Sequence, residues 1–211
     1  MNFKKIYHSR QYKIFELLGL YIAVPLLLKF YILEGWLKII PLILLAIFFA
    51  ILLLNDETFD KKILYSFNID QFKKSLLRLF VITILVIAFT WWFYTYLLFD
   101  YIEQEPIGFL ITFFLYPVAS VIPQELIYRV YFFHRFPIVF RDKLLLIFAN
   151  AFIFGFTHLI YANWVAPITT FLASILFIYN YRKSKTLLNV SFEHYVYGII
   201  LFAVGLGYFF H

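Results

Sequence analysis

The chain has 211 residues, of which 64% are hydrophobic, 24% aromatic and only 14% charged. A soluble domain is about 45–50% apolar and about 25% charged, so this composition excludes an ordinary soluble monomer. It predicts a polytopic membrane protein with an all-α fold. Cysteine is absent, which excludes disulfides and thiolate chemistry. The net charge of +6 does not indicate a nucleic-acid partner, because the basic residues do not gather in one segment.

Seven hydrophobic blocks follow one another and predict about seven transmembrane helices in one membrane domain over residues 1–211. The fifth and sixth blocks touch, and we place their turn at Asn163, Trp164 and Pro167, because proline disrupts a helix ladder. The first block is expected to be a retained span, since Lys29 and Phe30 follow it where a signal peptide would have small residues. The blocks are Leu17–Leu28, Ile39–Leu54, Leu79–Phe99, Ile107–Ile122, Leu144–Trp164, Val165–Tyr179 and Leu187–Phe210.

The basic residues alternate from one inter-block segment to the next. Sixteen of the 18 lie before the first block, or between the second and third, the fourth and fifth, or the sixth and seventh. Because lysine and arginine concentrate in cytoplasmic loops, the N-terminus is expected in the cytoplasm and the C-terminus outside, in a bacterial cell membrane. The longest polar segment, Asp56–Arg78, alternates apolar and charged residues and predicts a helix lying in the cytoplasmic interface.

One polar cluster, Pro123–Arg129, directly follows the fourth block, and apolar residues resume after it. A helix from about Gly108 to His134 would run through the cluster. Glu125 and Arg129 are then four residues apart on one face and can form an ion pair. A structural ion pair at a helix end is the simpler alternative to a functional site.

Two further clusters bring histidines into hydrophobic blocks, Phe154–His158 in the fifth and Asn189–His194 in the seventh. Either histidine has a structural alternative, such as a bond from His158 to a backbone carbonyl. At 1.5 Å of rise per residue, Glu125, His194 and His158 lie roughly 15, 14 and 22 Å from the cytoplasmic side. These three residues are therefore expected to share a layer and to line one cavity, with Arg129 holding Glu125. There they would activate a water or ligate a metal such as zinc.

The order of these clusters resembles the CAAX-processing and bacteriocin-processing family of intramembrane metalloproteases, of the type II CAAX prenyl endopeptidase kind. The resemblance rests on Gln124 to Arg129, then Phe154 to His158, then His194, and places a protease-like core at about residues 105–211. It implies that Glu125 and Arg129 match the family's second acid and its arginine. His158 and His194 match the histidines of the second and third motifs.

Two positions depart from the family pattern. Gln124 stands where the resemblance places the first glutamate, and an amide cannot take a proton from water. Gly198 stands where it places an asparagine that stabilises the oxyanion. Either Glu125 has become the base, or the chain is a degenerate member. If Glu125 faces Arg129, the cation makes it a poorer base. If Glu125 faces His158, it is available as one.

Three functions follow from this pattern. The first is an intramembrane endopeptidase that uses activated water to cleave a membrane protein or peptide substrate near the cytoplasmic face of the lipid bilayer. The second is a non-catalytic family member that acts as a membrane binding or bacteriocin-immunity protein. The third, a transporter or proton channel, is disfavoured because the sequence contains no inverted repeat. Glu193 and Asn189 match no motif position and receive no role.

Overall fold

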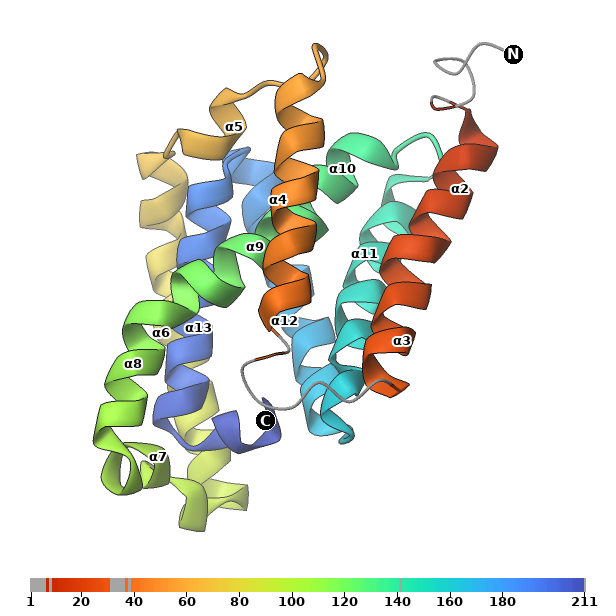
Figure 1. Ribbon diagram of the computed structural model, residues 1–211. Helices are drawn as coiled ribbons and strands as arrows, with labels where there is room; N and C mark the ends of the chain where they lie inside the picture. The colour runs from red at the N-terminus through yellow and green to blue at the C-terminus, as the bar shows by residue number, and fades with distance from the viewer. Residues whose placement is uncertain (1–6, 8, 31–36, 38, 141, 211) are drawn as a thin grey trace.

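The computed structural model describes residues 7, 9–30, 37, 39–140 and 142–210, and all regular structure in these residues is helical (Figure 1). The all-α prediction is therefore confirmed. The α-helices are α2 (Arg10–Leu18), α3 (Val24–Phe30), α4 (Ile39–Asn55), α5 (Lys62–Tyr65), α6 (Ile69–Phe93), α7 (Asp100–Gln104), α8 (Pro106–Tyr116), α9 (Ile122–Glu125), α10 (Phe132–Arg135), α11 (Lys143–Thr157), α12 (Val165–Ser184) and α13 (Leu187–Ala203).

Three helical segments of the described chain are long and apolar enough to cross a membrane: Ile69–Phe93, Pro106–Arg135 and Lys143–Tyr161. The helices Ile39–Asn55 and Leu187–Ala203 are apolar but shorter. Many large apolar side chains face outward, among them Phe80, Leu85 and Trp92 on α6. Such an exterior is unfavourable in water and suits a lipid surrounding.

The segments that carry most of the basic residues meet at one end of the bundle, where Figure 1 shows α5, α10 and the start of α2. Arg10 donates a hydrogen bond to the Val139 carbonyl at 3.1 Å. His134 on α10 contacts Asp56 at 2.9 Å, just after α4. Asn189 in α13 bonds the backbone of Asn68 before α6. The alternate segments in which the basic residues concentrate thus lie at the same end of the helix bundle.

The polar segment Asp56–Arg78 does not form the separate helix expected from its pattern. Lys62–Tyr65 is a single short turn of helix, and residues from Ile69 onward already belong to α6. Asn68 caps α6 by accepting a hydrogen bond from the Gln71 amide, so the helix begins ten residues before the hydrophobic block. The predicted end of this block, Phe99, was also wrong, because α6 ends at Phe93.

The helix predicted to run through Pro123–Arg129 is confirmed, because Pro106–Arg135 is continuous. Two π-helical segments interrupt its α-helical turns, Pro117–Val121 and Leu126–Tyr131. Pro117 has no amide hydrogen for the Phe113 carbonyl, and the Tyr195 hydroxyl donates to that carbonyl at 3.1 Å. In the second segment the Tyr21 hydroxyl donates to the Ile127 carbonyl at 2.8 Å. π-Segments are often found at functional sites.

The turn between the fifth and sixth blocks lies where the sequence predicts it. Asn163 accepts a hydrogen bond from the Ala166 amide, α12 begins at Val165, and Pro167 occupies the first turn, where its missing amide hydrogen costs little. Farther along α11, a Cβ on Gly155 would lie 2.8 Å from the Pro167 carbonyl oxygen. Glycine therefore permits the close packing of α11 against α12 that brings His158 into the centre of the bundle.

Candidate functional site

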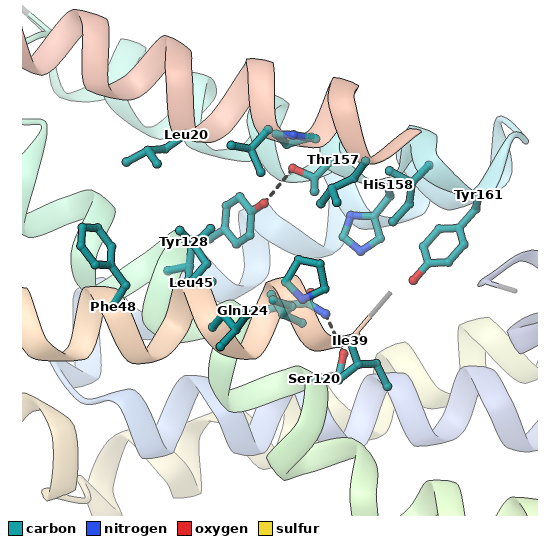
Figure 2. A pocket seen from close by; sticks show the side chains of 18 residues that line it. Leu20, Ile39, Leu45, Phe48, Ser120, Gln124, Tyr128, Thr157, His158 and Tyr161 are labelled. Atoms are coloured by element: carbon teal, nitrogen blue, oxygen red, sulfur yellow. Dashed lines mark hydrogen bonds between the residues drawn. The ribbon is translucent and has the colours of Figure 1, made fainter. Parts of the chain in front are cut away.

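A cavity of about 540 Å³ lies between α8, α9, α11, α12 and α13. Both predicted histidines line it, together with Gln124 and Phe154. A second, mostly apolar cavity of about 410 Å³ adjoins the first and shares Ser120, Gln124 and His158 with it. Figure 2 shows Gln124 and His158 directed toward this second space from different helices. The two cavities therefore meet at the pair Gln124 and His158.

Arg129 and Glu125 form the predicted ion pair. Both side chains are fully buried, and Arg129 Nε lies 3.3 Å from Glu125 Oε2. The guanidinium also donates to Asn150 Oδ1 at 2.9 Å and to Ser174 Oγ at 3.1 Å, and lies 4.6 Å from the centre of the Phe154 ring. Such a cage holds the cation in one position, as a buried charge requires.

Glu125 lies behind His194, whereas the sequence pattern placed it on the cavity wall. Its Oε1 is 2.7 Å from His194 Nδ1, and it is not among the described residues that line either cavity. No contact joins it to His158 in the described part of the chain. The carboxylate thus joins Arg129 to His194 and fixes the orientation of that imidazole. A carboxylate placed in this way is a positioning group and has no direct access to a substrate.

His158 is held by the alternative contact that the sequence left open, a bond to a backbone carbonyl. Its Nδ1 lies 2.7 Å from the Phe154 carbonyl oxygen. A carbonyl only accepts hydrogen bonds, so Nδ1 carries the hydrogen and Nε2 of the neutral ring has a free lone pair. No described residue bonds to Nε2, which belongs to a ring that lines both cavities. The structural bond therefore prepares His158 to accept a proton.

Gln124 takes the position on the cavity wall that was expected for Glu125. Its Nε2 donates to Ser120 Oγ at 2.7 Å, and its buried Oε1 has no hydrogen-bond partner among the described residues. A buried carbonyl-type oxygen is costly to leave without a donor. A water or a substrate N–H in the cavity would satisfy it.

The proposed metal ligands Glu125, His158 and His194 do not converge on one point. The described residues contain no group of three His, Asp or Glu side chains arranged to bind a metal ion. Both nitrogens of His194 already have partners, Glu125 and the Tyr116 hydroxyl, and one nitrogen of His158 is bonded to a carbonyl. This donor set does not fit the tetrahedral zinc site considered from the sequence.

Tyr116 and the region around Glu193 were not assigned roles from the sequence. Tyr116 lines the larger cavity, and its hydroxyl lies 3.2 Å from His194 Nε2. Glu193 is not among the described residues that line this cavity, and it accepts two 2.7 Å bonds from Arg78, which tie α13 to α6. Since adjacent helix residues differ by about 100° in direction, His194 and Glu193 serve different faces.

Comparison with known proteins gives one family match. Residues 106–200 match the family described as type II CAAX prenyl endopeptidase Rce1-like, which confirms the resemblance expected from the three motifs. This range includes Gln124, His158 and His194 and most of the residues that line the larger cavity, whereas much of the smaller cavity is lined by residues that precede the range. The searches of curated proteins and of solved structures gave no match.

Proposed function

We propose, from the match of residues 106–200 to the type II CAAX prenyl endopeptidase Rce1-like family, that the larger cavity hydrolyses peptide bonds with an activated water. The observation that carries this proposal is the Nε2 atom of His158, which bonds to no described residue and lies in one cavity with Gln124 and His194. The membrane context of the family indicates a membrane protein or a hydrophobic peptide as substrate.

His158 is the proposed general base. Its Nε2 takes a proton from water while the water oxygen bonds to the substrate carbonyl carbon, and the carbonyl oxygen becomes negative. The Gln124 Oε1 atom accepts the second hydrogen of the same water and positions it. When the carbon–nitrogen bond breaks, the His158 imidazolium returns the proton to the leaving nitrogen.

His194 is the proposed electrostatic partner. As an imidazolium it donates from Nδ1 to Glu125 and from Nε2 toward the negative oxygen. Together with Arg129, which lies behind Glu125, the cluster then has a net positive charge close to that oxygen. A fixed positive charge stabilises a negative oxygen more strongly in a site that excludes water than it does in solution.

The decisive variant for this proposal is His158→Gln. We expect the unmodified protein, purified in mild detergent, to cleave short hydrophobic peptides that carry a fluorophore and a quencher, at a low rate because Gln124 is not an acid. His158→Gln should reduce the rate by about 10²–10⁴-fold, since it removes the base. His134→Gln makes the same change outside the cavity and should have little effect. Equal rates in the two variants would contradict the role of His158.

A non-catalytic role remains the second candidate, and Gln124 favours it. The amide is bonded to Ser120 and stands where the family resemblance expects an acid. In that case the two cavities bind a peptide or membrane partner without cleaving it, as a bacteriocin-immunity protein would. Peptide binding without cleavage, unchanged in His158→Gln, would support this alternative.

The orientation in the membrane is also a proposal, supported by the basic segments that meet at one end of the bundle. We expect about seven crossings, with the N-terminus in the cytoplasm and the C-terminus outside. Reporter fusions after Lys185 and after His211 should then report opposite sides, the first cytoplasmic. Reports from the same side for both fusions would contradict this topology.

A further inference from the structure

The cavity contains a second hydrogen-bond donor beside His194, the hydroxyl of Tyr116. Tyr116 is the last residue of α8, directly before the π-segment that begins at Pro117. Its hydroxyl oxygen lies 3.2 Å from His194 Nε2, and its ring meets the His194 ring nearly edge-on, at 79°. The phenol is thus fixed relative to the imidazole that Glu125 orients.

The position of this phenol depends on the absence of a side chain at residue 198. A Cβ built on Gly198 would overlap the Tyr116 hydroxyl and ring. The Phe202 ring, one turn farther along α13, packs edge-on against Tyr116 with 5.3 Å between ring centres. Tyr116 therefore occupies the space that a polar side chain at position 198 would fill, and it carries a hydroxyl into that space.

We propose that Tyr116 and His194 form a two-donor oxyanion site, in which the Tyr116 hydroxyl supplies the donor that Gly198 lacks. Two donor atoms 3.2 Å apart can both reach one oxygen at about 2.7–3.1 Å, the distance such a site requires. In the resting protein the two groups bond to each other. When the carbonyl oxygen arrives between them, O–H and Nε2–H both turn to it, and no covalent bond to either residue forms or breaks. This inference rests on the proposed function of the cavity.

The first test compares Tyr116→Phe, which removes only the hydroxyl, with Tyr195→Phe. Tyr195 is a matched control, because its hydroxyl bonds the Phe113 carbonyl and it does not line the cavity. Loss of one oxyanion donor should reduce kcat by about 10²–10³-fold with little change in KM. The Tyr195→Phe variant should retain the unmodified rate. Equal rates for the two variants, in a protein that cleaves, would overturn the inference and leave the proposed hydrolysis standing.

The second test does not require cleavage. The probe is a hydrophobic peptide with a phosphinate, a tetrahedral anion, in place of one amide, compared with the same peptide containing the amide. The unmodified protein should bind the phosphinate more tightly, and Tyr116→Phe should lose most of that preference. Such a preference without cleavage would support the donor pair and reject hydrolysis. No preference and no cleavage would reject both.

A side-chain exchange provides the third test. Gly198→Asn alone should be inactive and less stable, because its side chain overlaps Tyr116. Tyr116→Ala removes both the ring and the hydroxyl and should also be inactive. Combining the two changes places an amide donor in the emptied space and should raise the rate, or the phosphinate preference, at least tenfold above Tyr116→Ala. A double variant no better than Tyr116→Ala would overturn the claim that the two positions exchange roles.

Discussion

Replacing Arg129 with methionine is expected to destabilise the fold by about 3–5 kcal/mol, because it leaves the Glu125 carboxylate buried without its cation. The change also removes the bonds to Asn150 and Ser174, which join α11 and α12 to the helix that carries Glu125. Equilibrium unfolding in mixed micelles with a rising fraction of denaturing detergent would measure the difference. Arg182→Met is the matched control, because Arg182 is exposed on α12.

A second variant separates the charge from the packing. In the double variant Arg129→Met with Glu125→Gln, no unpaired carboxylate remains, so part of the lost stability should return. If Arg129→Met is as stable as Arg182→Met, the buried pair does not hold these helices together. If the double variant is no better than the single one, the loss is due to packing alone.

Gln124→Glu is expected to raise the cleavage rate by about 10²–10⁴-fold, the usual contribution of a positioned acid or base. Gln124 lines both cavities beside His158, and its Oε1 has no partner among the described residues. A carboxylate there gains what the amide lacks, the ability to accept a proton. The measurement is the initial rate on the quenched peptides.

Gln104→Glu is the control for added charge, because Gln104 makes the same change on the exposed surface of α7. One other result would identify a different residue as the group that accepts the proton. If Gln124→Glu has no effect while Glu125→Gln abolishes cleavage, Glu125 is the base in spite of its burial behind His194. If neither variant cleaves but both bind peptide, the non-catalytic reading is correct.

The features that the sequence predicted well depend on local spacing. Glu125 and Arg129 pair because helical residues four apart share a face, and the turn at Asn163 follows from the polar residue and the proline beside it. The presence of His158 and His194 in one cavity was predicted from their depths along the helices, which need only the rise per residue.

The direction in which a side chain points was harder to predict. Gln124 and Glu125 differ by about 100° around the helix, so a small change in phase decides which of them faces the cavity. The π-segments at Pro117–Val121 and Leu126–Tyr131 change that phase on both sides of the pair. Pro117, the first residue of the first segment, is the only proline in either one, and proline does not specify the extent of an irregularity.

Tyr116 was missed for a different reason. Its role depends on contact with His194 and Gly198, which are 78 and 82 residues away in the sequence. The glycine at position 198 indicated that a side chain was absent, but not which residue fills the space. Similarly, the start of α6 at Ile69 depends on the Asn68 cap and its bonds to Asn189, and hydrophobicity alone placed the helix too late.

Transfer of oxygen from water to the product tests most directly whether this cavity is hydrolytic. The peptide is incubated with the Gln124→Glu protein in water enriched in ¹⁸O, and the mass of the N-terminal product is measured by mass spectrometry. We predict that the new carboxyl group carries one ¹⁸O atom, that the unmodified chain forms the same product more slowly, and that adding His158→Gln to either protein lowers the rate of labelling by about 10²–10⁴-fold. An unchanged rate of labelling without His158, or the absence of any labelled product from both the unmodified and the Gln124→Glu protein, would contradict the proposal.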